Sequence, residues 1–447
     1  MMHLPGYAAR AVERLEQAGF ETWAVGGCVR DALTGRQSAD IDCEVYGLAP
    51  QALRSLAAEF GEVDESGARY GIFSLKGAGI DLAVPRLERR TGPKHGDFDV
   101  RLDPALPFVR AAARRDFTVN AILRDALTGE IVDPFGGQED LRSGVLRCVG
   151  DPARRFAEDA LRILRLLRFA SVLGFSVEEN TARAARERRD GLRAIAHERV
   201  YAELNKLLCG EHAAAVLLEY PDILGVVLPE ILPCVGFDQR NIHHCYDLYT
   251  HIVLSVDSVA AEPVLRWTML LHDIGKVNTF TEDERGQMHF YGHPKVSAAM
   301  AEDICTRLRM RKKDREDIVT LIAWHDRDIP VTEKGIGSAV RALGEENFRR
   351  LLAVKRADNR AQAPEYRWVC QKIDRAEEIL EELLRKKQCL CLKDLAVNGN
   401  DLLALGYEGR EIGAALEWLL EGVIAGEIDN KRDALLAALA KKDLLLP

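Results

Sequence analysis

The sequence predicts an α+β chain, with a small mixed β-sheet first and helices in nearly all that follows. Up to about residue 150, short alternating or β-branched segments are separated by glycine turns, which is typical of strands in a small sheet. From about Pro152 the apolar residues recur at helical spacing almost to the C-terminus. The order of the two patterns indicates a sheet-based head followed by an all-helical remainder.

The head is expected to begin with a helix over residues 7–18 that ends at Gly19. A strand over 21–25 runs into a glycine turn, and a helix follows over 29–34. Strands are expected over 38–47 and 74–84. The charged segment between Pro85 and Pro107 is interrupted by glycines and further prolines, so we expect a mobile loop there. Residues 130–141 indicate a strand, a turn and the start of a helix.

The helical part is expected to open with one long helix over 151–175, because Asp151 suits the N-cap and Pro152 the first helical position. Further helices are expected over 180–208, 247–260, 295–310, 313–325, 338–356, 366–386 and 411–423.

Composition narrows the class of protein. At 447 residues the chain has room for three or four domains of about 100–150 residues each. A net charge of −9 argues against a generally basic nucleic-acid-coating protein, although an RNA enzyme needs only local positive patches. No CxxC pair, no apolar leader and no stretch of about 18 apolar residues is present. We expect a cytoplasmic protein with reduced thiols and no membrane partner; the sequence carries no signal for an oligomeric state.

Two aspartates in a predicted strand are the first candidate for catalysis. Asp40 and Asp42 are separated by one residue, so strand alternation puts both carboxylates on one face. Paired carboxylates repel each other but are good ligands for Mg²⁺, which can activate a hydroxyl and neutralise a triphosphate. Asp81, on a neighbouring predicted strand, is the candidate third carboxylate. Surface acidic residues are the alternative for all three.

The glycine turn ahead of these aspartates is a candidate phosphate site. Gly26 and Gly27 let the backbone approach a ligand closely, the following helix N-terminus favours anions, and Arg30 can reach phosphate oxygens. A tight turn with a surface Arg30–Asp31 ion pair is the alternative.

Together these segments resemble the class II tRNA nucleotidyltransferases and bacterial poly(A) polymerases of the polymerase β superfamily. The resemblance rests on the order and spacing of GGCVRD (26–31), DID (40–42), RRDFTVNA (114–121), IVDPFGG (131–137) and EDALRILRLLRF (158–169). It resumes over 395–430, which is similar to the tail of CCA-adding enzymes that also carry an HD domain.

The resemblance implies a nucleotidyltransferase head at 1–150, a helical neck at 151–215, an HD body at 216–365 and a tRNA-binding tail at 366–447. It implies Mg²⁺ at Asp40 and Asp42. Nucleotide contacts are implied for Gly26, Gly27, Arg30, Arg115, Asp159, Arg162, Arg165 and Arg168. One departure is Cys43-Glu44 after DID, where small or apolar residues are more usual; Glu44 adds negative charge near the expected metal.

The residue chemistry of the neck fits selection of cytosine and adenine. A carboxylate such as Asp159 accepts from an exocyclic amino group, and a guanidinium such as Arg162 donates to a ring acceptor. Guanine and uracil would leave both groups unpaired. On one continuous helix the side chains at 159, 162, 165 and 168 would drift by about 60° per step. An ordinary helix with a Glu158–Arg162 pair is the alternative. Within RRDFTVNA, we expect Asp116 to orient an arginine and Asn120 to fix the local backbone.

A second set of residues resembles the HD phosphohydrolase superfamily. The sequence LLHDIGK (270–276) places a His-Asp pair in an apolar helix, and the resemblance implies a metal held by His251, His272, Asp273 and Asp358. His293 and His325 would extend the site toward a second metal. Imidazole and carboxylate ligands suit a divalent transition metal, with Mg²⁺ as a further option. The metal would activate water against a phosphoester; a structural metal is the alternative.

These observations predict an enzyme that adds CCA to the 3′ end of tRNA from CTP and ATP, with phosphohydrolase activity as an option open to its HD domain. A poly(A) polymerase, or an enzyme that adds only CC or only A, uses the same chemistry. An HD phosphohydrolase with an RNA-binding head is the alternative of another class, and the intact DID argues against it.

Overall fold

The computed structural model describes residues 6–38, 40–77, 79–90, 98–385, 392–424 and 426–443. The chain divides into two compact units. One holds residues up to 216 together with 222–227, and the other holds 217–221 together with the residues from 228 onward. No helix in the described ranges is long and apolar enough to cross a membrane.

The first unit is built on a seven-stranded mixed sheet, which confirms the expected small sheet in the head. Its strands run in the order β3-β4-β5-β2-β1-β8-β9, and β2 and β5 are parallel. The strands are β1 (Thr22–Val25), β2 (Ile41–Val45), β3 (Val63–Asp64), β4 (Ile72–Leu75), β5 (Ile80–Ala83), β8 (Leu123–Asp125) and β9 (Ile131–Val132).

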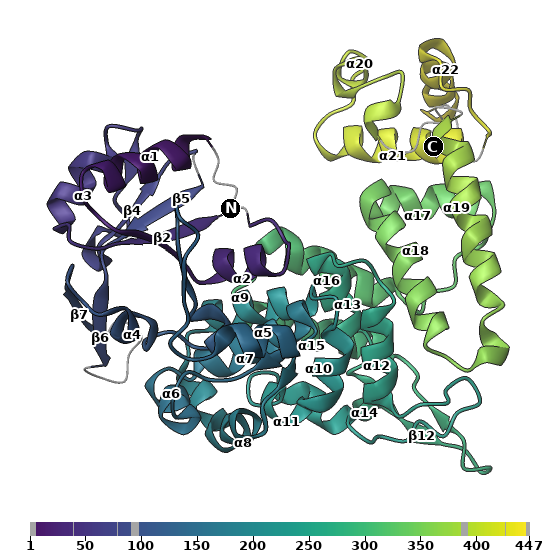
Figure 1. Cartoon of the computed structure of the whole chain (residues 1–447). Helices are drawn as coiled ribbons and strands as arrows, with labels where there is room; N and C mark the ends of the chain where they lie inside the picture. The colour runs from purple at the N-terminus through teal and green to yellow at the C-terminus, as the bar shows by residue number, and fades with distance from the viewer. Residues whose placement is uncertain are drawn as a thin grey trace. The chain divides into compact units, whose positions relative to one another are not determined.

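Alternation along β1 and β2 separates two cores. Ala24, Cys43 and Val45 face a cluster that includes residues of α1 (Gly6–Gln17), α2 (Gly27–Leu33) and α3 (Pro50–Ala57), and α1 and α3 lie near each other in the purple part of Figure 1. Trp23 and Val25 face the other way, onto residues from 106 to 123 that include α4 (Phe108–Ala112). Asp42 and Glu44 share this second face because they alternate with Cys43.

Two head expectations are wrong in detail. Residues 74–84 form no single strand, because a turn with positive φ at Gly77 and Gly79 separates β4 from its antiparallel partner β5. The segment after Pro85 is no structureless loop, because β6 (Arg86–Arg90) pairs with β7 (Phe98–Leu102) in an antiparallel hairpin. Both strands of this hairpin lie outside the main sheet, so they carry charged side chains instead of the alternating apolar pattern that predicts a strand. Residues 91–97 lie outside the described ranges.

The segment after β9 forms as expected. Asp133 accepts hydrogen bonds from the backbone of Gly137 and Gln138 at 2.8 Å and so caps α5 (Gly137–Ser143). A Cβ at Gly137 would lie 2.1 Å from the carbonyl oxygen of Thr118, so this position admits only glycine. Thr118 belongs to a short 3₁₀ turn, Thr118–Asn120, that holds the RRDFTVNA segment against the sheet.

The long helix expected over 151–175 is broken. The structure has α6 (Pro152–Glu158) and α7 (Leu161–Leu173), with Asp159 in an extended conformation between them (φ −148°, ψ 105°). Asp151 does cap α6, accepting from the backbone of Ala153 at 3.0 Å. The break has a local cause: the Asp159 carboxylate accepts from the backbone of Leu161 at 3.1 Å and so caps the second helix.

The rest of the first unit is helical, as expected. The 180–208 region contains α8 (Glu179–Arg188), a 3₁₀ segment (Arg189–Ala194) and α9 (His197–Leu208), followed by α10 (Ala213–Glu219) and α11 (Pro221–Leu224). Helices α7 and α9 pack closely, which places side chains of the neck beside the head residues described below.

The second unit is helical apart from a short β12–β13 hairpin (Thr281–Glu282, Met288–His289). Its helices are α12 (Leu248–Asp257), α13 (Pro263–Leu271), α14 (Lys276–Thr279), α15 (His293–Arg307), α16 (Lys312–Trp324), α17 (Glu333–Leu343), α18 (Glu345–Arg360), α19 (Val369–Arg385), α20 (Gly399–Leu403), α21 (Arg410–Ile424) and α22 (Arg432–Asp443). The single helix expected over 338–356 is wrong, because Gly344 adopts φ 77° and ψ 159° and separates α17 from α18.

Candidate active site and metal centre

The glycine turn brings three predicted residues together. Gly26 links β1 to α2 with φ 78°. A Cβ at Gly26 would lie 2.9 Å from Nη1 of Arg115 and 3.8 Å from Oδ2 of Asp42. Arg115 and Asp42 are far apart in sequence, so the fold itself places a guanidinium and a carboxylate beside one bare stretch of backbone.

The aspartates lie where strand β2 begins. Asp40 precedes the strand, Asp42 lies within it, and Asp81 is the register partner of Asp42 on parallel strand β5. Burial raises the pKa of Asp42, the negative charge of Asp81 raises it further, and Arg115 opposes both effects. The Asp42 carboxylate and its neighbours Asp40 and Asp81 offer oxygen donors, which fit a hard divalent cation such as Mg²⁺.

Glu44 has a different role from the one expected at sequence level. It is almost fully buried, and its carboxylate accepts from Arg114 at 2.5 Å, from Arg115 at 3.1 Å and from the hydroxyl of Tyr46 at 3.1 Å. Burial favours the neutral acid, but Arg115 and Arg114 outweigh burial and hold the pKa of Glu44 below its ordinary value. Its charge is therefore neutralised by two arginines, which the sequence spacing could not reveal.

Arg30 is buried instead of lying open on the surface. Its Nε and Nη2 donate to Asp31 at 2.9 and 2.7 Å, and its Nη1 donates to Asn120 at 2.8 Å. Asn120 in turn donates to Asp116 at 3.1 Å. The Arg30–Asp31 pair, given above as the alternative to phosphate binding, is present but buried, and it belongs to a network that links the glycine-turn helix to the RRDFTVNA segment.

Asp116 orients an arginine, as expected, and that arginine is Arg165 of the neck. Arg165 Nε donates to Asp116 at 2.7 Å. Burial opposes ionisation of Asp116, but Arg165 and Asn120 hold its pKa below the ordinary value. Arg168 lies one turn further along α7, with its Nε 3.2 Å from Glu203 of α9.

Phe169 joins these arginines, a contact that sequence reasoning missed. The guanidinium carbons of Arg168, Arg30 and Arg165 lie 4.1, 5.2 and 5.6 Å from the centre of its ring. Cations this close to an aromatic ring are attracted to it. One aromatic side chain therefore helps to hold three predicted nucleotide-binding arginines in one place.

The helix break changes the geometry expected for Asp159 and Arg162. Asp159 lies off α7, so the drift calculated for a continuous helix does not apply to it; its Oδ2 accepts from Arg199 at 3.2 Å. Arg162 donates to Glu158 at 3.2 Å and to the carbonyl of Arg114 at 3.1 Å. The Glu158–Arg162 pair is thus present, and Arg162 also ties the neck to the RRD segment.

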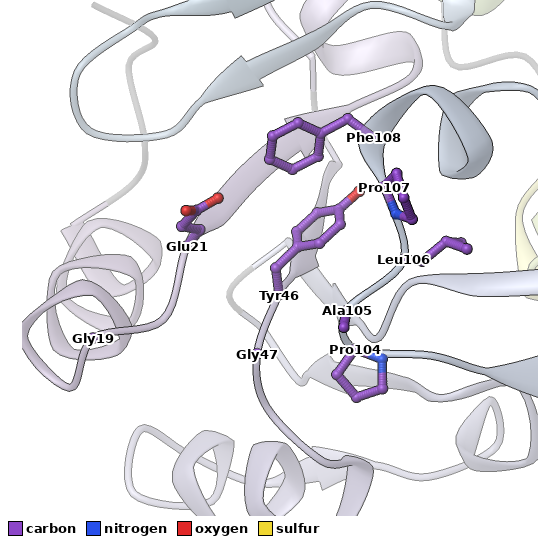
Figure 2. Close-up of a pocket in the computed structure, with 9 residues that line it drawn as sticks. All are labelled: Gly19, Glu21, Tyr46, Gly47, Pro104, Ala105, Leu106, Pro107 and Phe108. Carbon is purple, nitrogen blue, oxygen red and sulfur yellow. The ribbon is translucent and has the colours of Figure 1, made fainter.

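A pocket in the head lies away from these residues. It has a volume of about 300 Å³ and is lined by Tyr46, Phe108, Glu21 and the segment Pro104–Pro107 (Figure 2). It sits where β1 begins and β2 ends, whereas the glycine turn and Asp40 sit at the opposite ends of these antiparallel strands. The chemistry-bearing residues identify the candidate active site better than this pocket does.

In the second unit, the HD residues gather as two sets that share one carboxylate. His251, His272, Asp273 and Asp358 offer donor atoms within 4.8 Å of one another, as do Asp273, His293 and His325. Asp273 Oδ2 lies 3.3 Å from His251 Nε2 and 3.4 Å from His272 Nε2. Its Oδ1 lies 3.2 Å from His293 Nε2 and 3.6 Å from His325 Nε2. Each oxygen of Asp273 therefore faces a different set.

All four histidines are oriented in the same manner. Each Nδ1 lies 2.7–3.2 Å from a backbone carbonyl, so Nδ1–H donates there and Nε2 is aimed at the cluster. The Nε2 atoms of His251 and His272 are buried without a hydrogen-bond partner. The Nε2 atoms of His293 and His325 face each other at 3.2 Å. Unpartnered donors converging in this way fit a divalent metal.

Further side chains surround this centre. Lys276 Nζ lies 2.6 Å from Asp273 Oδ2 and 3.1 Å from Gln239 Oε1. Its distance to His244 Nε2 is 3.3 Å, and burial together with Lys276 lowers the pKa of His244 to about 3. Lys276 is the last residue of the LLHDIGK segment, whereas Gln239 lies outside the segments that predicted this site.

Family models match the segments of the chain that contain the two candidate sites. The description Poly A polymerase head domain matches residues 22–147, and HD domain matches 242–363. Between them, residues 174–234 match the family described as "Probable RNA and SrmB- binding site of polymerase A". The first of these matches spans the glycine turn, the aspartates and the RRD segment, and the second spans both sets of HD ligands.

Curated relatives decide the family. A multifunctional CCA protein of Xanthomonas campestris pv. campestris (strain B100) is 32% identical over 420 residues, covering 89% of this chain and 96% of the relative. The chain belongs to the multifunctional CCA protein family. Another member of this family, from Halorhodospira halophila, is 34% identical over 343 residues, covering 74% of this chain and 80% of the relative.

Solved structures of CCA-adding enzymes share the fold of this multifunctional CCA protein family member. The Bacillus stearothermophilus CCA-adding enzyme in complex with CTP matches with a TM-score of 0.71 at 25% identity, covering 98% of this chain and 97% of that one. The Thermotoga maritima enzyme complexed with tRNA matches with a TM-score of 0.59 at 19% identity, covering 98% and 96%. Family membership makes the chain a nucleotidyltransferase with an appended HD domain.

Proposed function

We propose that this chain adds C, C and A in turn to the 3′ end of tRNA, using CTP and ATP. The observation that carries the proposal is the position of Gly26, where Arg115 and the Asp42 carboxylate flank the same bare backbone. A triphosphate needs close backbone approach, a guanidinium and a divalent cation, and this turn offers the bare backbone, the guanidinium and a carboxylate that could hold the cation. The relatives named above support CCA addition over other uses of the same chemistry.

In the proposed reaction, the 3′-hydroxyl of the RNA attacks the α-phosphorus of the nucleotide and pyrophosphate leaves. Asp40 and Asp42 would hold Mg²⁺, which supplies charge neutralisation and activation of the hydroxyl when bound. Gly26 and Gly27 allow the phosphates to approach, and Arg115 balances their negative charge. Arg30 acts through its hydrogen bonds to Asp31 and Asn120, which fix the helix that begins at the glycine turn.

Nucleotide choice is assigned to the neck. Asp159, freed from the helix by the break, would accept from the amino group of cytosine or adenine, and Arg162 would donate to the neighbouring ring acceptor. Arg165 and Arg168 supply positive charge held in place by Asp116, Glu203 and Phe169. A pair that satisfies both C and A, and leaves G and U unpaired, accounts for the use of two nucleotides by one site.

The test is to incubate the protein with tRNA that lacks its 3′ end, with CTP and ATP together and singly, and then to sequence the products. Addition of CCA with both nucleotides supports the proposal. Long A tails from ATP alone, or addition of only CC or only A when both nucleotides are present, would contradict it. Asp42→Ala should abolish addition, because the remaining ligands are too few to hold the metal.

The HD unit favours a second activity, hydrolysis of a phosphoester at a divalent metal. The specific observation is that Asp273 offers one oxygen to each ligand set while unpartnered Nε2 atoms face it. A metal there would lower the pKa of a bound water, and Lys276 would steady the phosphate. The test is release of phosphate, or opening of a cyclic phosphate, by the wild type in Mn²⁺ or Ni²⁺ and its loss in His272→Ala. An inactive wild type in every metal would favour a structural role.

A further inference from the structure

We propose that Glu44 is a positioning residue that draws Arg115 away from Asp42 and so keeps the Asp42 carboxylate available to the catalytic metal. The proposal rests on the proposed function, in which Asp42 holds Mg²⁺ and Arg115 contacts the nucleotide. It concerns the position after the DID segment at which this sequence departs from the usual small or apolar residue.

Arg115 lies near two carboxylates, those of Glu44 and Asp42. Its Nη2 donates to Glu44 at 3.1 Å, while Nη1 and the Asp42 Oδ2 atom both lie within 4 Å of the point a Cβ on Gly26 would take. Asp42 and Glu44 share one face of β2 because they alternate with Cys43. The ion pair described for Arg115 is the one with Glu44.

The second step is that Glu44 is itself fixed. Its side chain is 2% exposed and is held by Arg114 at 2.5 Å and by the hydroxyl of Tyr46 at 3.1 Å. A buried carboxylate with three donors has little freedom, so it anchors Arg115 through Nη2, while Nη1 is the nitrogen beside Gly26. Without the Glu44 carboxylate, Asp42 would be the remaining acidic side chain of β2 near Arg114 and Arg115. Arg115 would then form its ion pair with Asp42.

An ion pair between Arg115 and Asp42 would compete directly with the metal for the same oxygens. The chain therefore uses the extra carboxylate to separate two functions on one strand: Glu44 binds the arginine, and Asp42 binds the cation. A role limited to folding would stabilise the head without changing how tightly the aspartates bind a divalent ion.

The experiment reads metal binding without turnover. Fe²⁺ replaces Mg²⁺ and cleaves the backbone next to the ion in the presence of hydrogen peroxide, with ascorbate to reduce the iron again, so fragments ending near residues 40–42 and near 272–273 report the head and HD sites separately. Glu44→Gln keeps the shape and removes the charge. Its half-saturation for cleavage at 40–42 should rise about fivefold or more, the scale of a competing ion pair, while cleavage at the HD site stays unchanged. Excess Mg²⁺ should restore kcat.

Removing the competitor is the decisive control. In Glu44→Gln/Arg115→Met, the Fe²⁺ concentration for half-maximal cleavage at 40–42 should return to within about twofold of the wild-type value. The KM for CTP should still exceed the wild-type value, because the proposed nucleotide contact of Arg115 is lost. Tyr46→Phe and Asp140→Asn are matched controls. Tyr46→Phe removes a hydrogen bond to Glu44 but keeps its charge. Asp140→Asn removes the charge of another buried carboxylate of the head, which is bonded to Thr118 and Arg147. Both should lower stability without weakening metal binding.

The proposal is overturned if Glu44→Gln binds Fe²⁺ at 40–42 as the wild type does, or if the double variant binds as weakly as the single one. Should Glu44→Gln fail to fold, Glu44→Gln/Arg114→Gln removes one charge of each sign and should show the same weak binding; wild-type binding in that chain also overturns it. Retention of nucleotide addition and cleavage in Asp42→Ala would instead reject the proposed function. Loss of both there, with Glu44→Gln normal, rejects only the role of Glu44.

Discussion

The carboxylate of Asp116, in the head, is bound by the guanidinium of Arg165, in the neck, with 2.7 Å from Nε and 2.6 Å from Nη2 to the same oxygen. The pair joins two segments that are 49 residues apart. It sits between the network of Arg30 and Asn120 on one side and Phe169 on the other.

Asp116→Asn should destabilise the first unit by about 1–3 kcal/mol at neutral pH, because a buried charge-assisted bond is lost. The folded-state pKa of Asp116 is held below the ordinary value of 3.8. Its contribution is therefore complete above about pH 4 and is lost as the pH falls through the lower folded value. Urea unfolding of both chains should give a constant difference from pH 5 to pH 8 that shrinks below pH 4. A difference that grows on acidification would contradict this.

Gly26→Ala should reduce kcat/KM for CTP by about tenfold or more, because the residue has φ 78° and its methyl group would lie 2.9 Å from Arg115 Nη1. Gly19→Ala is the matched control, since φ is 86° there and nothing lies within 4 Å of the added methyl. Both chains should be less stable, and only the first should lose activity. Equal losses in steady-state assays would show that backbone strain alone is responsible.

Asp159→Asn should weaken discrimination between CTP and UTP by roughly tenfold to a hundredfold, because the amide can donate to the uracil carbonyl that the carboxylate cannot satisfy. The ratio of kcat/KM for the two nucleotides measures the effect. Arg199→Met removes the arginine that bonds Asp159 and should change the ratio less, since the carboxylate remains. An unchanged ratio in Asp159→Asn would remove Asp159 from nucleotide selection.

His325→Ala should lower the metal content of the second unit from two ions per chain to one, because it belongs only to the set formed with His293 and Asp273. His251→Ala should weaken the other set. Elemental analysis after equilibrium dialysis against Mn²⁺ gives the count, with Asp42→Ala as the correction for the head. CCA addition should stay within about twofold of wild type in both histidine variants, since the HD ligands belong to the other unit. Two ions retained in His325→Ala would argue against the second set.

Much of the fold could be predicted because local signals agree with it. The strand pattern around Asp42 and the helical spacing after Pro152 both describe elements that the structure contains. The sequence pattern did not predict helix breaks, which occur where a side chain hydrogen-bonds to the backbone or where a glycine changes the direction of the chain. Asp159 ends one helix and caps the next, and Gly344 divides another, although the apolar spacing runs through both breaks.

The structure brings some predicted site residues together, such as Gly26 with Arg115 and Asp42, because motif order encodes a common three-dimensional arrangement. Partnerships outside the motifs could not be predicted in this way. Glu44 is bound to Arg114 across 70 residues, and Arg168 lies against Glu203 of another helix. Such pairs depend on which faces of the strands and helices pack against each other. The local sequence around each residue does not determine that packing.

The shared carboxylate of Asp273 makes the two halves of the HD centre electrically dependent on each other. One negative charge serves both, so an ion on one oxygen diminishes the attraction that the other oxygen can offer a second ion. Metal occupancy of the two ligand sets would then rise over a wide range of metal concentration instead of at a single threshold. A hydrolase built in this way would respond gradually to metal concentration, while the aspartate oxygens of the head would bind Mg²⁺, as proposed above.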